Sequence, residues 1–576
     1  MATHIIRYRV GRIVRKMNSA DKRDLASHHF RTERVLTLTY TVCYACRVLG
    51  IHKRAWLLVL LSAGLQILIF PLPDLYFLCW IAIVPLLVGL LRAREPGTLQ
   101  FEEGIKLLPA KPWQAFVLAY VCGILWYGFT CYWIYGTMRH FGGVNAPAAL
   151  GILILFCLYL GLYHGAFGLL VSLIVGTSPL SRRALLLAPA LWVAVELART
   201  RITGFPWDLL GISQVDNIPL ARIARFTGVY GLSFEIMVVN SALAAAFLLR
   251  RQKRKSLLLA SLSAALVLQA GRFANPPALQ TDHAAVLVQE NVPILDSSDW
   301  TKDYFENTLH DLVALSMSSA SAAHPRPSLI VWPESPAPFY STDPTFRDAM
   351  SGLARQANTW VVAGSVGIRN ASNTAERATQ VYNSAALISP AGEWISRYDK
   401  VHLVPFGEYV PFRRLFSFAS GLTEQVGDFN RGTSRQPLQA GDTKLGVFIC
   451  YESIFPDEVR QFAAGGAQVF VNISNDGWYG DSGAYAQHLK QARMRAVEND
   501  RWLLRDTNTG VTAAIDPYGR IVARAPRKVR TALVAPYSLS SETTFYTRYG
   551  DWFAYLCAII SLAAIVSRLL FRGTET

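Results

Sequence analysis

The hydrophobic and polar positions of this chain follow two different patterns. Up to about residue 270, and again near the C-terminus, apolar residues continue through whole segments without a polar face. A helix that crosses the hydrocarbon core of a bilayer needs about 20 such residues, and the shorter segments here lie near the lower limit of that length. We therefore predict eight membrane helices, at 55–70, 75–91, 113–138, 146–176, 184–197, 221–249, 256–270 and 552–570.

The stretch between the seventh and eighth segments has the pattern of a water-soluble domain. Short apolar runs bounded by turn residues recur along it, and 303–317 and 485–499 have a helical pattern. Strands that alternate with helices predict an α/β domain. The predicted strands are 284–289, 328–332, 360–366, 385–389, 445–450, 468–474, 511–516 and 531–535.

Composition agrees with a membrane protein. Of the 576 residues, 52% are hydrophobic and 17% are charged, and 14 are Trp, which differs from the soluble average. The net charge of +16 would suit a nucleic-acid binder, but the cations lie largely in the N-terminal arm and in short loops beside apolar segments. No basic stripe with interleaved aromatic residues accompanies them. We therefore expect an integral membrane protein that binds no nucleic acid.

The cations of the short loops predict the orientation of the membrane helices. With the N-terminal arm in the cytoplasm, the cations at 92–94, 182–183 and 250–255 fall on the cytoplasmic side, whereas Arg199 and Arg201 oppose this assignment. The chain then divides into a basic cytoplasmic extension (1–54), a seven-helix part of the membrane domain (55–271), an extracytoplasmic domain (272–550), a C-terminal membrane helix (551–571) and a cytoplasmic tail (572–576).

Cys450 ends an apolar, β-branched run and is followed by Tyr451 and Glu452. It is the only cysteine between Gly271 and Asp551, so its own domain offers no partner for a disulfide or for a multi-cysteine metal site. A lone cysteine is more often a small buried hydrophobe, but a thiol at the end of a strand can also face a pocket as a nucleophile. We expect neither a metal nor a cofactor.

Glu334 and Lys400 are two further residues that could act together with Cys450 in catalysis. Glu334 follows a buried strand directly after Trp332 and Pro333, where partial burial raises a carboxyl pKa toward general-base use; the alternative is an exposed loop residue. Lys400 lies in an apolar, turn-rich stretch. We predict that Glu334 accepts the proton of the thiol and that Lys400 stabilises the oxyanion.

Histidine partners for the thiol stay open at this point. Neither His402 nor His488 is close to Cys450 in the sequence, yet either could lie beside it in the fold and form a Cys-His pair. The backbone N–H of Tyr451 is a second candidate donor to the oxyanion.

The order Glu334, Lys400, Cys450 in these settings resembles the nitrilase superfamily. Additional motifs resemble one branch of it, the bacterial apolipoprotein N-acyltransferases. The resemblance covers roughly residues 55 to 570 and is specific, because any amidase could carry the triad but not the flanking membrane spans. The motifs are 402–411 (HLVPFGEYVP), 473–480 (ISNDGWYG), 487–488 with 492–496 (QH and ARMRA), and, in the membrane part, 203–207 (TGFPW) and 211–214 (GISQ).

The resemblance implies a polytopic α-helical membrane domain that carries an α-β-β-α sandwich. It also implies that Cys450 takes an acyl chain from a phospholipid as a thioester and passes it to the N-terminal amine of a diacylglyceryl-modified apolipoprotein. The supporting residues of the family map onto Glu408, Tyr451 and Glu452. A substrate-binding Trp maps onto Trp300, for which simple packing is an equal alternative.

Two other functions fit parts of the sequence. A membrane-anchored amidase would use the same three residues with water as the second nucleophile, although one anchor helix would suffice for it. A transporter with a nitrilase-like sensor domain would need ionisable residues within its spans, and the sequence offers Glu196 near the end of one span and Glu235 within another. We favour the acyltransferase, a monomer in the bacterial inner membrane whose catalytic domain faces the periplasm.

Overall fold

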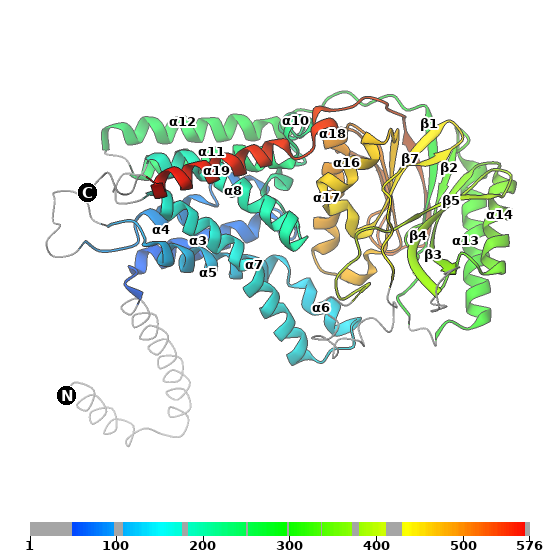
Figure 1. Ribbon diagram of the computed structural model, residues 1–576. Coiled ribbons are helices and arrows are strands. Elements are labelled where there is room, and N and C mark those ends of the chain that lie inside the picture. Colours follow the sequence, from blue (N-terminus) through cyan, green and yellow to red (C-terminus); the bar gives the residue numbers. More distant parts are fainter. Residues whose placement is uncertain are drawn as a thin grey trace, which may run out of the picture.

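The computed structural model describes residues 49–96, 107–175, 182–248, 251–295, 299–335, 337–370, 379–409 and 429–570. It contains a bundle of apolar helices at one end and a two-sheet α/β domain at the other (Figure 1). The predicted fold class is therefore confirmed. Nearly all of the predicted N-terminal extension, including Cys43 and Cys46, and the tail at 572–576 lie outside the described residues.

All eight segments that were predicted to cross the membrane contain helix. In the described part of the chain, five helices are long and apolar enough to do so: α5, α7, α11, α12 and α19. The number of crossings stays a prediction. The helices are α3 (Lys53–Ile69), η1 (Tyr76–Trp80) with α4 (Val84–Leu91), α5 (Pro112–Thr130), α7 (Ala146–Val175), α8 (Arg182–Ala198), α11 (Val229–Leu248), α12 (Arg251–Ala270) and α19 (Trp552–Leu570).

Helices α5 and α7 pack closely against each other in the bundle. A β-carbon at Gly168 of α7 would clash with the carbonyl group of Ala115 in α5, and one at Gly123 would lie 2.7 Å from Cβ of His164. Small residues at these positions let the two backbones approach, which is the usual way in which helices pack inside a membrane.

The segment predicted as one helix at 113–138 is two helices in the structure. Helix α5 ends at Thr130, and α6 (Trp133–His140) leaves the bundle toward the α/β domain (Figure 1). There Oγ1 of Thr137 donates a hydrogen bond of 2.9 Å to the carbonyl oxygen of Trp478. The break therefore lets one short helix join the two parts of the molecule.

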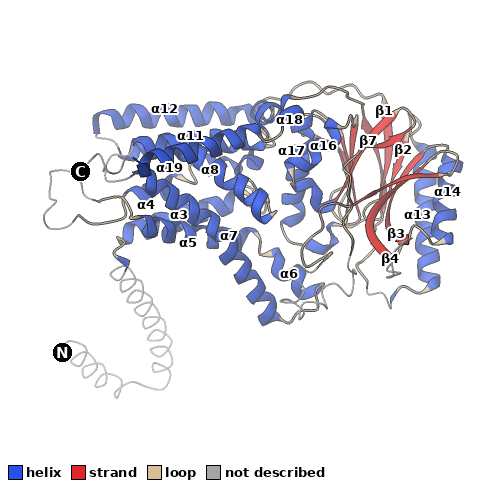
Figure 2. Cartoon of the chain, in the orientation of Figure 1, coloured by secondary structure: helices blue, strands red, loops and turns tan. Residues whose placement is uncertain are grey.

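The α/β domain has four layers (Figure 2). Helices α13 (Lys302–Ala322) and α14 (Pro344–Ala357) cover the outer sheet, and α16 (Pro456–Ala464) and α17 (Ala484–Asn499) cover the other. The outer sheet has the order β12 (Thr531–Tyr537), β1 (His283–Gln289), β2 (Leu329–Val331), β3 (Trp360–Asn370), β4 (Thr379–Ile388), β5 (Trp394–Asp399). The inner sheet has the order β11 (Ile521–Arg524), β10 (Ala513–Ile515), β9 (Leu503–Thr507), β8 (Val469–Ser474), β7 (Thr443–Ile449), β6 (Leu438–Ala440).

Helix α17 lies between the inner sheet and the helix bundle (Figure 1). All its residues from Gln487 to Asn499 are buried, although several are charged. Nζ of Lys490 lies 2.6 Å from Asp74, and Nη2 of Arg493 lies 2.6 Å from Asp216. Both aspartates belong to the membrane part, so these ion pairs hold the two parts together.

Among the described residues of this domain, the sequence pattern missed four strands and three α-helices: β5, β6, β9, β11, α14, α16 and α18 (Phe545–Tyr549). Strand β9 shows the reason most clearly. Its sequence LLRDT carries two charges, yet every residue is buried. Arg505 pairs with Asp476, and Asp506 accepts a hydrogen bond of 3.0 Å from the backbone of Val288 in the other sheet. Partners from distant segments make a charged strand compatible with the core, and a local pattern does not contain them.

Candidate active site

Cys450 lies at the point where strand β7, next to the edge strand of the inner sheet, ends and the short helix η7 (Cys450–Ile454) begins. Its side chain is 6% exposed, and its φ angle is +51°. A non-glycine residue seldom adopts this left-handed conformation, and such residues cluster at active sites. The thiol therefore lies in a turn at the end of the strand, and its role as the nucleophile stays a prediction.

The structure brings the predicted acid and ammonium groups together. Nζ of Lys400 lies 3.2 Å from Oε1 of Glu334 and 2.9 Å from Oε1 of Glu408. Lys400 follows β5, Glu334 follows β2, and all three side chains are buried. A cation between two carboxylates in a dry setting is a strong, fixed electrostatic feature.

Asn383 of β4 is a member of this cluster that the sequence pattern did not identify. Its Nδ2 atom donates hydrogen bonds of 2.7 Å to Glu334 and 2.6 Å to Glu408. Backbone N–H groups bind the outer oxygens of the same carboxylates: Asn475 donates to Glu334 and Val404 donates to Glu408, both over 2.7 Å. Each carboxylate is therefore fixed from two sides.

The charges determine which groups carry protons. Burial by itself lowers the pKa of the Lys400 ammonium, but Glu334 and Glu408 outweigh it and hold that pKa well above its usual value. Burial raises the pKa of the Cys450 thiol well above its usual value, and Glu334 adds to the rise while Lys400 opposes it. The thiol is thus protonated at rest and needs a base when it attacks.

Glu452 fastens the nucleophile turn to the loop that carries Lys400. Its Oε1 atom accepts hydrogen bonds from the backbone of Val401 (2.8 Å) and His402 (3.0 Å) and from the hydroxyl of Tyr398 (2.7 Å). Its Oε2 atom accepts one of 2.8 Å from the backbone of Ile449. Burial nevertheless raises the pKa of Glu452. The side chain of Glu452 therefore fixes the distance between the loop that follows Lys400 and the turn that carries Cys450.

Tyr451 connects the site to the membrane part. Its hydroxyl donates a hydrogen bond of 3.1 Å to the carbonyl oxygen of Gly204, within the TGFPW motif. Its ring packs against His402 and Phe455. The predicted nucleophile thus sits at the junction of the two parts of the molecule.

The two candidate histidines have other partners. His402 stacks on Phe455 and contacts Glu458 over 2.9 Å. His488 reaches Cys450, but through the carbonyl oxygen, over 3.0 Å. Burial lowers the pKa of His488. This geometry favours Glu334 over either histidine as the base for the thiol.

Trp300 lies just before α13, half-buried, with its ring 5.1 Å from that of Tyr304. It packs against the core between the outer helices and the outer sheet, whereas Cys450 belongs to the separate core that runs between the two sheets and into the helix bundle. Its substrate-binding role stays a prediction.

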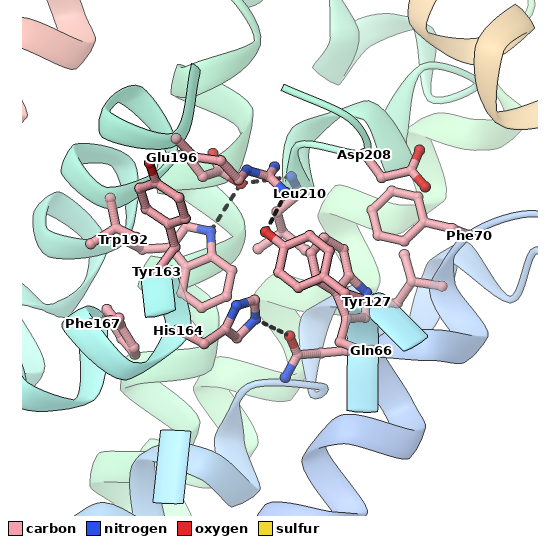
Figure 3. Close-up of a pocket in the computed structure, with 14 residues that line it drawn as sticks. Gln66, Phe70, Tyr127, Tyr163, His164, Phe167, Trp192, Glu196, Asp208 and Leu210 are labelled. Carbon is pink, nitrogen blue, oxygen red and sulfur yellow. Dashed lines mark hydrogen bonds between the residues drawn. The ribbon is translucent and has the colours of Figure 1, made fainter. Parts of the chain in front are cut away.

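A second group of polar side chains lies inside the helix bundle (Figure 3). Nη1 of Arg199 donates a hydrogen bond of 2.7 Å to the hydroxyl of Tyr127, and Glu196 accepts bonds from Trp192 (3.1 Å) and from the backbone of Leu210 (2.8 Å). They surround a cavity of about 30 Å³. That volume suits a water molecule or two and is too small for an acyl chain.

Comparison with known proteins covers both parts of the chain. Residues 289–545 match the carbon-nitrogen hydrolase family, and residues 62–242 match the apolipoprotein N-acyltransferase N-terminal domain. The apolipoprotein N-acyltransferase of Geobacter metallireducens is 36% identical over 534 residues, which are 91% of this chain and 96% of that protein. That of Methylococcus capsulatus is 35% identical over 78% of this chain and 87% of its own length.

The fold and these matches define a membrane enzyme built on a carbon-nitrogen hydrolase domain. More narrowly, the chain belongs to the apolipoprotein N-acyltransferase family, whose activity serves lipoprotein maturation. The predicted family is confirmed, and the transporter and the anchored amidase give way to it.

Proposed function

We propose that this enzyme transfers a fatty acyl chain from a membrane phospholipid to the N-terminal amine of a diacylglyceryl-modified apolipoprotein, through a thioester on Cys450. One observation carries the proposal. The buried Lys400 lies between Glu334 and Glu408, and the charges of Lys400 and Glu334 act on the thiol of the left-handed Cys450. Family membership supplies the reaction class.

In the first step, the Cys450 sulfur attacks the carbonyl carbon of an acyl ester. Glu334 accepts the thiol proton, and the ammonium of Lys400 stabilises the oxyanion that forms on the carbonyl oxygen. The C–O bond then breaks, and Glu334 returns the proton to the departing alkoxide. The products are an acyl-thioester on Cys450 and a lysophospholipid.

In the second step, the terminal amine of the apolipoprotein attacks the thioester carbon. Glu334 accepts a proton from the amine as the C–N bond forms and the C–S bond breaks, and it then gives that proton to the thiolate of Cys450. An amide is formed and the enzyme returns to its starting state. Two covalent half-reactions predict ping-pong kinetics.

The position of the site suits substrates whose reacting groups lie at a bilayer surface. Cys450 and Tyr451 adjoin the bundle through Gly204, and α6 links the bundle to the inner sheet. Acyl chains can stay in the bilayer while the ester and the amine reach the sulfur. We place the enzyme in the bacterial inner membrane, as a monomer, with the catalytic domain on the periplasmic side.

Trapping the acyl-enzyme tests the proposal. Wild-type protein given phospholipid without an acceptor should carry one acyl chain on the peptide that contains Cys450, as measured by mass spectrometry. Cys450→Ala should carry none, and Cys450→Ser should lose transfer while it keeps its fold. Cys557→Ser, which changes a cysteine of α19, is the matched control and should keep the thioester.

Adding an amine-bearing lipopeptide to the trapped enzyme should move the chain to that amine. Release to water instead would indicate a hydrolase. Near-normal N-acylation by Cys450→Ser would refute the thioester mechanism.

A further inference from the structure

A fully buried histidine of α17 contacts the backbone of the proposed nucleophile. Nε2 of His488 lies 3.0 Å from the carbonyl oxygen of Cys450 and 2.8 Å from Oγ of Ser453. A carbonyl oxygen can only accept a hydrogen bond, so Nε2 carries the proton in this contact. The ring therefore anchors the peptide group that directly follows the nucleophile.

This peptide group needs an anchor because of the conformation of Cys450. A φ of +51° places the residue in a sparsely populated region, at a cost of about 1–3 kcal/mol that the surroundings have to offset. If the backbone relaxed to a common conformation, the Cα–Cβ bond would turn and carry the sulfur away from Glu334 and Lys400. Holding the carbonyl group prevents that rotation.

His488 is itself held firmly from several sides. With the proton on Nε2, its Nδ1 atom is an acceptor, and Nη2 of Arg505 donates to it over 3.1 Å while forming a buried ion pair of 2.9 Å with Asp476. Its ring stacks on Trp207 at 5.9 Å and meets Tyr479 edge-on at 5.7 Å. A side chain fixed in this way can orient another group without moving.

Trp207 belongs to the membrane part, in the same motif as the Gly204 carbonyl that binds Tyr451. Its indole N–H donates a hydrogen bond of 2.8 Å to Gln487, the residue next to His488. The membrane part thus contacts the nucleophile turn at two points, one directly and one through the histidine.

We propose that His488 is a positioning residue: its Nε2–H bond to the carbonyl oxygen of Cys450 holds the nucleophile in the left-handed conformation that presents its sulfur to the acyl ester. The histidine exchanges no proton with the substrate and does not contact it. The inference rests on the proposed role of Cys450 as the nucleophile, and it assigns a function to the QH motif that the triad leaves unused.

Two substitutions separate this role from a purely structural one. Glutamine can place an amide nitrogen near the position of Nε2, whereas asparagine is one carbon shorter and reaches only the position of Nδ1. His488→Asn therefore keeps an acceptor for Arg505 and loses the contact with Cys450, and His488→Gln does the reverse. His310→Gln, at an exposed position of α13 with 83% of the side chain accessible, is the control.

The measurement is the single-turnover rate of thioester formation on Cys450, with phospholipid and without an acceptor. His488→Asn should slow this rate about 10- to 100-fold with little change in the phospholipid concentration that gives half the maximal rate, because misplacing a reacting atom by an ångström costs about that much. His488→Gln should recover most of the rate, and His310→Gln should match wild type. Thermal unfolding in detergent gives the folded fraction to which each rate is normalised.

Several results would overturn the proposal. Equal rates for the folded fractions of His488→Asn and His488→Gln would mean that the histidine serves the fold alone. Ser453→Ala removes the other partner of Nε2 and should keep the rate within about threefold; a loss as large as that of His488→Asn would transfer the role to Ser453. If wild type forms no thioester on Cys450, the proposed nucleophile is wrong. That result concerns the proposed function and is distinguishable from the two results for the variants of His488 and Ser453.

Discussion

Lys400 is 1% exposed and keeps its positive charge between two carboxylates. Taking an ammonium group out of water costs several kcal/mol, which nearby opposite charges and hydrogen bonds have to offset. Here Glu334 and Glu408 supply the charges, and the amide of Asn383 fixes both of them by donating to each. At the scale of single residues, these four side chains form one hydrogen-bonded cluster whose charges act on the thiol of Cys450.

Replacing Asn383 tests this cluster. Asn383→Ala should lower kcat for N-acylation about 10- to 100-fold, because hydrogen bonds to charged groups contribute about 1.5–3 kcal/mol each and both carboxylates lose one. Steady-state kinetics with a lipopeptide acceptor measures the effect. Thr379→Ala changes an exposed position on the same strand and should leave kcat unchanged. An unaltered kcat for Asn383→Ala would exclude the amide from the site.

A local sequence pattern marks some residues of the proposed site and not others. Cys450 and Glu334 follow apolar strands, and Lys400 lies in an unusually apolar loop, so the local sequence indicates each of them. Asn383 had no such mark, because one polar residue on a strand usually faces solvent. Its importance depends on two carboxylates that lie 49 and 25 positions away along the chain.

At the scale of elements, helix α17 shows that a local pattern can predict a helix without predicting what its side chains contact. Its helical pattern predicted a helix at 485–499, and the structure has one at Ala484–Asn499. Nothing in that pattern predicted that Lys490 and Arg493 are buried. Their burial depends on Asp74 and Asp216, which the fold delivers from the membrane part.

The last turn of α17 should make stability depend on pH. Glu498 is fully buried, its carboxylate contacts Arg495 over 2.7 Å, and it accepts a hydrogen bond of 3.0 Å from the backbone of Val229 at the start of α11. Burial raises the pKa of Glu498 from 4.5 to about 7, against the opposing effect of Arg495. The folded state therefore binds more protons than the unfolded state between these two values, and stability falls as pH rises through them.

This group alone should lower the free energy of unfolding by up to about 3 kcal/mol between pH 4.5 and 8. Unfolding temperatures in detergent, taken across that range, measure the slope. Glu498→Gln cannot ionise but keeps an oxygen for the N–H of Val229, so its slope should be shallower than that of wild type, whatever its absolute stability. Parallel slopes would show that Glu498 stays ionised in the fold.

At the scale of the whole molecule, the proposed orientation makes a direct prediction. A cysteine introduced at Ala391, in the exposed turn between β4 and β5, should react with a membrane-impermeant maleimide on intact spheroplasts. A cysteine introduced at Arg254, at the exposed start of α12, should react only after the membrane is permeabilised. The reverse labelling pattern would place the catalytic domain in the cytoplasm.

The two ends of the catalytic domain lie side by side. Strand β1, which follows the last helix of the bundle before the domain, pairs antiparallel with β12, which precedes α19, and His283 faces Tyr537 in their register. The catalytic domain is therefore inserted between two helices of the bundle, and the chain enters and leaves it at neighbouring points. The catalytic domains of two relatives could therefore be exchanged by joining the chains at these two neighbouring points. A preference for an acyl donor or acceptor that moved with the exchanged domain would then belong to that domain.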